Sequence, residues 1–324
     1  MRRLLPLFIL LLPLTLSSTA FAWLSTGHRI IAIIAWDDLS PTARTEISAI
    51  LKAHPRYKED LLGGIADDAS PQATDLYAFE SAATWPDMVR SFSNPMHFAY
   101  NHPAWHFIDI PYCVDGQKVP PTPPGPPGPQ NILDALNACV AEMKNPKATD
   151  TDKSIAICWI LHLCGDIAQP LHCCNMYSPQ FPSGDKGGNS LIVLRDPPYT
   201  DSQANLHFIW DSLPGDFEDR DIEYYIAEGL RNDPRYSRQK LKSLVAITDF
   251  TAWANESHAL AIKYAYLNGQ LSVINTPPAD ADAGNQIPGL PPGYLKTAEQ
   301  IGDQRLILAG YRTADLLNSL FPLP

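Results

Sequence analysis

Residues 154–167 of the chain have the sequence SIAICWILHLCGDI. This run is apolar almost all the way round a helix, which is typical of a helix that is buried on every side. Only His162 and Asp166 interrupt it, one helical turn apart on the same face. Alone, a buried histidine is more often a hydrogen-bonded core residue than a metal ligand. An imidazole and a carboxylate together on a buried face must both be satisfied, however, and a bound cation satisfies both.

The segments on either side of this run are also mostly helical in pattern. Apolar residues at helical spacing predict a helix over Thr26–Asp38, with Pro41 as its stop. A shorter helix is predicted over Asn205–Ser212, with Asn205 as its cap. Longer helices are predicted over Leu241–Leu267 and Leu295–Leu320, and the main strand signal is Ser190–Leu194. We therefore predict an all-α fold, a bundle-like single domain with minor β content.

Two proline-rich stretches interrupt the helical pattern. Val119–Pro129 contains seven prolines in eleven residues, a composition that favours an extended conformation over the surface. A plain loop explains this stretch better than a docking motif, because such loops need no partner. Thr276–Pro292 is predicted to be a second connection, leading into the last helix.

The first 22 residues have the pattern of a cleavable export signal. Arg2 and Arg3 precede an apolar run over Leu4–Leu16, and Ala20-Phe21-Ala22 follows. The run is too short to span a bilayer comfortably. We therefore expect residues 23–324 to form one exported domain that begins at Trp23, is periplasmic or secreted, and has no membrane anchor.

The charge balance excludes one mode of nucleic-acid binding. The formal net charge is −11, and loss of Arg2 and Arg3 with the signal would make it −13. A broad basic surface is therefore not expected, because neutralising phosphates needs clustered lysines and arginines. Bound cations can reverse the sign of the charge locally.

The six cysteines all lie after residue 22. An exported protein meets an oxidising compartment, so disulfides or inert core thiols are both open, with 15 possible pairings. On one helix, Cys158 and Cys164 would lie about 9 Å apart along the axis, too far to pair with each other. No two cysteine pairs have the spacing of a zinc ribbon.

Further histidines and aspartates repeat the pattern seen at residues 162 and 166. His207 and Asp211 again stand one helical turn apart, and imidazole and carboxylate ligands suit zinc. His172 follows Asp166 after a short turn. Asp87, in the segment Trp85-Pro86-Asp87, and His106, in Trp105-His106-Phe107, are two further candidates. We expect such pairs to converge in a helical core.

Cleavage before Trp23 would add an unusual ligand. The freed α-amine has an ordinary pKa near ~7.7, well below the ~10.4 of lysine, so a metal displaces its proton easily. The Trp23 amine and carbonyl oxygen can chelate one ion together, with His28 five residues further on.

Taken in order, these motifs resemble those of the S1/P1-type nucleases, which share a superfamily with zinc-dependent phospholipase C. The resemblance covers essentially all of the chain after residue 22. It runs through Trp23-x4-His28, Trp85-Pro86-Asp87-x2-Arg90, Trp105-His106-Phe107-Ile108-Asp109, His162-Leu163-Cys164-Gly165-Asp166-x2-Gln169-Pro170-Leu171-His172, Gly187-Gly188-Asn189 and Asn205-Leu206-His207-x3-Asp211.

The resemblance implies a trinuclear zinc site and divides the ligands among its ions. The first zinc ion would be held by Asp87, His106, His162 and Asp166. Asp166 would bridge to a second ion completed by the Trp23 amine and carbonyl and by His28. The third ion would be held by His172, His207 and Asp211.

The resemblance also implies the activity: hydrolysis of single-stranded DNA and RNA to 5'-phosphorylated products, and of 3'-nucleotides. Two close cations lower the pKa of a shared water enough to provide a nucleophile at neutral pH. Asp87, Arg90 and Asp166 would be the catalytic residues, and Arg90 would contact phosphate. Phe107 would stack on a base, Asp109 would hydrogen-bond its edge, and Asn189 would line the same pocket. No stable protein partner is implied, and a monomer is expected.

Two other classes share parts of this pattern. A phospholipase C would have the zinc ligands but would lack the base platform, and relatives of that kind tend to have Glu where Asp211 stands. A structural zinc protein would close its site with four tight ligands, often cysteines. Phe107, Asp109 and Asp211 therefore favour the nuclease by site chemistry.

Overall fold

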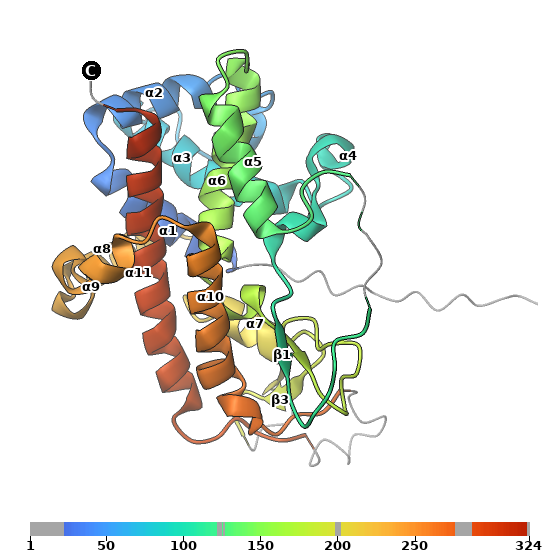
Figure 1. Cartoon of the computed structure of the whole chain (residues 1–324). Coiled ribbons are helices and arrows are strands. Elements are labelled where there is room, and N and C mark those ends of the chain that lie inside the picture. Colours follow the sequence, from blue (N-terminus) through green and yellow to red (C-terminus); the bar gives the residue numbers. More distant parts are fainter. Residues whose placement is uncertain (1–22, 122–124, 126, 198–201, 276–286, 323–324) are drawn as a thin grey trace, which may run out of the picture.

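The computed structural model describes residues 23–121, 125, 127–197, 202–275 and 287–322. Within them the chain is mostly helical, as predicted (Figure 1). The α-helices are α1 (Ser25–Asp38), α2 (Pro41–Leu51), α3 (Pro71–Met88), α4 (His97–Tyr100), α5 (Ile132–Lys144), α6 (Asp150–Asp166), α7 (Leu206–Asp211), α8 (Arg220–Asn232), α9 (Arg238–Val245), α10 (Phe250–Leu260) and α11 (Tyr294–Leu320). Shorter 3-10 turns are η2 (Pro103–His106), η3 (Pro170–Cys173), η5 (Pro234–Tyr236) and η7 (Leu267–Gly269), and single π turns are η1 (Tyr57–Leu61) and η6 (Ala261–Ala265).

Helix α6 lies at the centre of the molecule, as its sequence predicts. It packs against α3 and α5, and α1 packs in turn against α11, α3 and α8. Every residue from Ser154 to Asp166 is buried. The helix begins at Asp150, four residues before the apolar run, because Thr149 and Asp152 form a reciprocal capping box. The two predicted ligands of α6 therefore lie within a rigid core.

Three further predicted helices are confirmed almost to the residue. These are α1, α7 and α11, and Asn205 caps α7 by accepting a hydrogen bond from the amide of Phe208 at 2.7 Å. Helix α1 stops before Pro41, but this proline is also the first residue of α2, and Ser40 caps it. A fixed φ suits proline to the first position of a helix.

The single helix predicted over Leu241–Leu267 is wrong. The structure has α9, a break, α10 and the π turn η6 in its place. Asp249 interrupts the helix because its side chain accepts a hydrogen bond from the amide of Ala252 at 2.7 Å and so caps α10. Arg312 of α11 donates to the carbonyl of Leu244 at 2.7 Å, which satisfies the end of α9.

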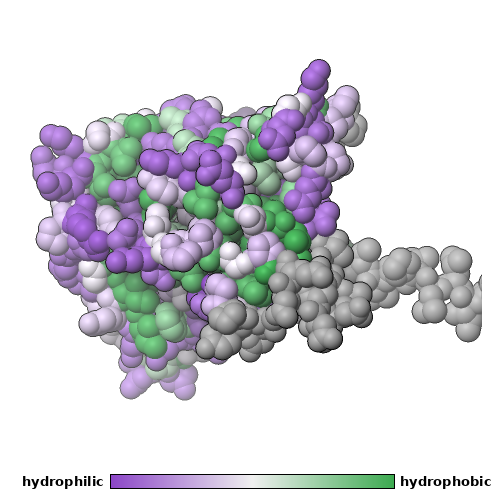
Figure 2. Space-filling view, turned by 90° about the horizontal axis from the view of Figure 1, so that it is seen from below, coloured by the Kyte–Doolittle hydropathy of each residue, from purple (hydrophilic) through white to green (hydrophobic). Residues whose placement is uncertain are grey.

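The β content is minor, as predicted. Strand β1 (Pro111–Cys113) pairs in parallel with β2 (Asn175–Tyr177), and β3 (Ile192–Leu194) pairs antiparallel with β4 (Gln203–Asn205). The predicted strand Ser190–Leu194 is therefore confirmed over its second half. Figure 1 shows both pairs below α6, on one side of α10. On the face seen from below, hydrophilic residues are interspersed with small hydrophobic groups (Figure 2), as is usual for a surface in contact with water.

Several predictions concern segments that the structure describes only in part. The export signal over residues 1–22 lies outside the described residues, as do residues 276–286 of the predicted connection Thr276–Pro292 and part of the proline-rich loop. Among the helices of the described ranges, none is long and apolar enough to cross a membrane. All six cysteines are free, five of them buried, so the structure supports core thiols over the disulfides that were also considered.

Candidate metal and phosphoester site

The two carboxylate oxygens of Asp166 face different histidines. Its Oδ2 lies 3.0 Å from Nδ1 of His106 and 3.2 Å from Nε2 of His162, whereas its Oδ1 lies 3.3 Å from Nε2 of His28. Asp87 at the end of α3 completes the first group, with Oδ1 3.8 Å from Nε2 of His162. One aspartate is thus shared by two sets of possible metal ligands, as expected for a bridging carboxylate.

The orientation of these rings places their nitrogen atoms close to one another. Nδ1 of His162 donates to the carbonyl of Ala83 at 2.8 Å, which directs Nε2 inward, 3.0 Å from Nδ1 of His106. Within the described residues, both ring nitrogens of His28, Nε2 of His106 and Oδ1 of Asp166 are buried with no hydrogen-bond partner. Buried polar atoms without partners are costly, and a metal ion bound between Nε2 of His28 and Oδ1 of Asp166 would satisfy these two atoms.

The charges of this group favour a bound cation. Burial alone would raise the pKa of Asp166, but the charge of His162 and hydrogen bonds from His106 and His162 outweigh it and hold that pKa well below its usual value. Burial opposes the charged form of His162, yet Asp166 and Asp87 raise its pKa to about 9. Burial lowers the pKa of His28 to about 4, so its lone pair is available at neutral pH. Without metal, a proton on His162 supplies the positive charge that the carboxylates require.

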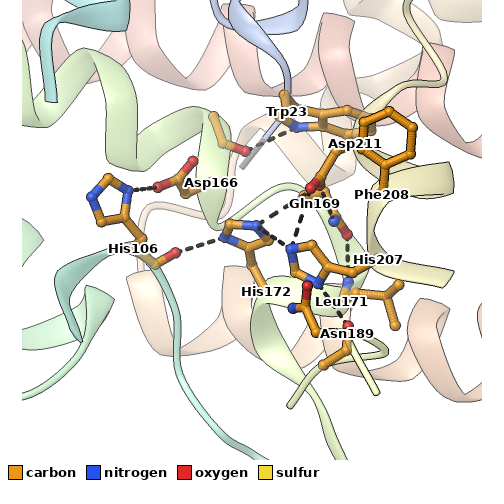
Figure 3. A network of polar contacts seen from close by, with 12 residues as sticks. Trp23, His106, Asp166, Gln169, Leu171, His172, Asn189, His207, Phe208 and Asp211 are labelled. Carbon is orange, nitrogen blue, oxygen red and sulfur yellow. Dashed lines mark hydrogen bonds and ion pairs between the residues drawn. The ribbon is translucent and has the colours of Figure 1, made fainter. Parts of the chain in front are cut away.

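Helix α1 brings Trp23 and His28 to this group. The buried Trp23 indole donates to the carbonyl of Gly165 at 3.1 Å, on α6 between the two ligands (Figure 3). A Cβ at Gly165 would lie 2.8 Å from Nδ1 of His28, so only glycine lets α1 approach this closely. The amide of Leu24 also donates to the carbonyl of Asp211 at 3.2 Å. The residue that would become the amino terminus is therefore fixed between α6 and α7.

A separate cluster contains His172, His207 and Asp211. Nδ1 of His172 donates to the carbonyl of His106 at 2.7 Å, and Nδ1 of His207 donates to the carbonyl of Gly187 at 2.6 Å. Their Nε2 atoms therefore face each other, 3.2 Å apart, and Nε2 of His207 lies 3.3 Å from Oδ2 of Asp211 (Figure 3). Burial raises the pKa of Asp211 well above its usual value. Three ligand atoms around one point again suit a cation.

Gln169 and Asp185 support the third cluster, and no role was predicted for either of them from the sequence. Gln169 donates to Oδ1 of Asp211 at 2.6 Å. Asp185 accepts from the amide of Gly188 at 2.9 Å and from the hydroxyl of Tyr266 at 2.8 Å. It thereby holds the turn whose carbonyl orients His207. Gln169 lies three residues before His172. Its contact with Asp211, however, depends on the packing of distant segments, which the spacing of residues in the sequence does not reveal.

The residues expected to contact substrate lie around these clusters. Arg90 is 3.2 Å from Oδ1 of Asp87, and the side chain of Phe107 is 39% exposed beside the buried His106. Asp109 is exposed at the surface. Partial desolvation of its carboxyl group raises its pKa, and a hydrogen bond from Asn175 opposes this rise. The amide of Asn189 donates to the carbonyl of Lys186 at 2.9 Å, and Figure 3 shows it beside His172 and His207.

The raised pKa of His162 predicts how the metal-free protein responds to pH. A group whose pKa is raised on folding stabilises the fold below its unfolded pKa of 6.5, and this contribution is lost as the pH rises toward 9. We expect the chelated protein to lose on the order of 2 kcal/mol between pH 6.5 and 8.5, measured by urea unfolding. Added zinc should reduce this loss, because metal binding improves as protons leave.

The variant His162→Asn is the control for this pH dependence. It should flatten the slope over the same range in chelated protein. An unchanged slope would contradict the assignment of this pH dependence to His162.

The chain is also similar in sequence to known nucleases. The profile of the S1/P1 nucleases matches residues 23–322. Endonuclease 5 of Arabidopsis thaliana is 28% identical over 93% of this chain and 91% of its own length. Nuclease P1 of Penicillium citrinum is 23% identical over 92% of this chain and 97% of its own. Nuclease S1 of Aspergillus oryzae is 26% identical over 65% of this chain and 60% of its own.

Proposed function

Because the chain belongs to the S1/P1 nuclease family, we propose that it hydrolyses single-stranded DNA and RNA to 5'-phosphorylated products and removes phosphate from 3'-nucleotides. Membership of the family makes it an endonuclease, a hydrolase of phosphodiester bonds that acts on nucleic acid. The observation that carries the finer proposal is the sharing of Asp166, whose two oxygens face two sets of buried histidines.

Three groups of side chains within the described residues can each hold a metal ion. We propose that the ions are three zinc ions, since neutral imidazoles and carboxylates are ligands that zinc accepts. Asp87, His106, His162 and Asp166 would hold the first. Asp166, His28 and the Trp23 amine and carbonyl would hold the second. His172, His207 and Asp211 would hold the third.

Zinc bound there would supply a nucleophile at neutral pH and positive charge for the phosphoryl oxygens. The chain's own residues would bind and orient the substrate. Arg90, held by Asp87, would donate to a phosphoryl oxygen, which stabilises the charge that develops there. Gln169 would keep Asp211 in place, since a hydrogen-bond partner behind a ligand fixes its orientation. The catalytic group is therefore Asp87, Arg90 and Asp166.

The substrate's base would bind next to this centre. Phe107 presents a partly exposed ring on which any unpaired base can stack, which explains a preference for single strands with little sequence selectivity. Asp109 would accept a hydrogen bond from the edge of the base, and Asn189 would line the same pocket. Three divalent cations would also make this pocket positive in an acidic protein, and phosphate could then bind without a basic surface.

We also propose that residues 1–22 are removed on export and that residues 23–324 act as one monomeric domain. The buried Trp23 between α6 and α7 supports cleavage at this point, since a free amine there would lie among the ligands.

One panel of substrates tests the proposed function. The processed, zinc-loaded protein should cleave single-stranded DNA and RNA and release phosphate from a 3'-nucleotide, and elemental analysis should find three zinc ions per chain. Hydrolysis of a phosphatidylcholine analogue without cleavage of nucleic acid would instead assign the chain the chemistry of a phospholipase C. A chain without zinc would contradict the metal assignment.

A smaller effect is expected from Asp109→Ala. This change removes a contact with the base edge and leaves the metal ligands in place. We expect KM for a 3'-nucleotide to rise by about tenfold with kcat nearly unchanged, the size of one hydrogen bond to a charged group. Steady-state kinetics on 3'-AMP would measure both constants. A loss confined to kcat would contradict the assignment of Asp109 to base binding.

A further inference from the structure

The segment that follows α3 exposes two aromatic rings near the candidate centre, Phe92 before α4 and Phe98 within it. The side chain of Phe92 is 80% exposed and that of Phe98 is 89% exposed, far more than Phe107. A phenylalanine ring is large and apolar, carrying about 150–250 Å² of surface that folding usually buries. Two such rings side by side on the surface therefore indicate a binding site.

A rigid base holds the two rings. The ring centroid of Phe92 lies 4.3 Å from that of His97, which lies 5.1 Å from that of Phe98, and the two phenylalanine rings are 6.5 Å apart. His97 is buried, and its Nδ1 lies 2.9 Å from the carbonyl of the fully buried Val89. The rings are thus fixed to the core through His97.

The turn that carries Phe92 is also anchored. The side-chain oxygen of Asn94 accepts from the amide of Met96 at 2.9 Å, and its nitrogen lies 3.3 Å from Oδ2 of the buried Asp60. Asp60 also accepts from the Trp85 indole at 3.1 Å. A fixed turn loses little conformational freedom when a ligand binds, which favours binding.

The position of the rings connects them with the phosphate site. Phe92 follows Arg90 by two residues, a length of chain that spans at most about 7 Å. Arg90 in turn lies 3.2 Å from Asp87, a member of the first ligand group. A single strand that places its phosphate at Arg90 would therefore carry its neighbouring nucleotides past Phe92 and Phe98.

We propose that Phe92 and Phe98 form a second base-stacking platform, which binds nucleotides of a single strand next to the one held at Phe107. The platform rests on the proposed nuclease function and extends it from one nucleotide to a longer strand. Stacking on exposed rings accepts any base. The platform therefore raises affinity for long single strands without adding sequence preference.

The double variant Phe92→Ala/Phe98→Ala tests the platform. We compare KM for a single-stranded DNA of about twelve nucleotides, within the usual site size of such grooves, with KM for a 3'-nucleotide. Loss of stacking should raise the ratio of KM for the single-stranded DNA to KM for the 3'-nucleotide by about tenfold. Phe92→Tyr/Phe98→Tyr keeps both ring faces and should retain the ratio of the unmodified enzyme.

Tyr225→Ala is the matched control, because this side chain is also 80% exposed but lies on α8. It should leave the ratio unchanged. If the unmodified enzyme cleaves both substrates and the double alanine variant keeps the same ratio, the platform is refuted and the nuclease function stands. A change in oligomeric state without a change in ratio refutes it as well, in favour of contact between copies. An unmodified enzyme that cleaves neither substrate overturns both proposals.

Discussion

One extra residue ahead of Trp23 should nearly abolish activity. Such a residue converts the α-amine of Trp23 into an amide, whose nitrogen no longer offers a lone pair to a metal. Loss of a residue that only hydrogen-bonds to a metal ligand already costs about 10–100-fold in metal affinity or activity. We therefore expect the loss of a direct ligand to reduce kcat/KM by at least about 100-fold.

The packing around Trp23 is the reason for so large an effect. Its indole is buried and hydrogen-bonded to Gly165, and the next amide is bonded to the carbonyl of Asp211. A Cβ at Gly27 would lie 2.7 Å from Cβ of Trp23, so α1 also packs closely against this side chain. An extension would therefore block the amine of a residue that is already held in place.

The measurement is zinc content together with activity on single-stranded DNA. Protein with the extension should bind fewer zinc ions than protein that begins at Trp23. The control is the same extended protein after a protease has removed the added residue, which should regain both metal and activity. Full activity with the terminus blocked would exclude the amine as a ligand.

The ligand residues could be predicted from the sequence because their spacing is local. His162 and Asp166 share one helix face, and so do His207 and Asp211, so each pair is predicted by helix geometry alone. The structure confirms that these pairs lie on buried helices. Which of these side chains share a metal ion was suggested by the resemblance and stays a prediction.

Two other features of the helices were harder to predict. Helix α3 carries Asp87 in its last turn, yet Pro86 lies inside it, and proline usually signals the end of a helix. The break between α9 and α10 depends on Asp249 and on Arg312 from another helix. The contact of Arg312 with Leu244 joins residues 68 positions apart, and such a contact leaves no periodic signal in the sequence.

The supporting residues were missed for the same reason. Asp185 is buried and bonded to the amide of Gly188 and the hydroxyl of Tyr266, 81 residues away. Burial raises its pKa to about 6, against the hydrogen bonds that it accepts. Nothing in the spacing of Asp185 distinguishes it from a surface aspartate in a glycine-rich turn.

Asp166→Ala should cause the largest loss among single substitutions. Asp166 is fully buried and its two oxygens face three histidines. Removing it would take a ligand from two ions at once and leave His28, His106 and His162 without their carboxylate. Removal of one group that stabilises charge in a transition state costs about 100–1000-fold. We expect kcat to fall by at least about 1000-fold, against a much smaller change in kcat for Asp109→Ala.

Asp166→Asn separates the charge of this side chain from its size. The amide fills the same volume but brings no negative charge, and it offers a hydrogen-bond donor where a ligand is needed. If Asp166 acts as a bridging ligand, Asn should lose zinc and activity nearly as fully as Ala. If the residue merely supports the fold, Asn should restore most of the activity that Ala loses. Zinc content, kcat and unfolding temperature measured on the same samples distinguish these cases, because a bridging role requires metal and activity to be lost together in a protein that remains folded.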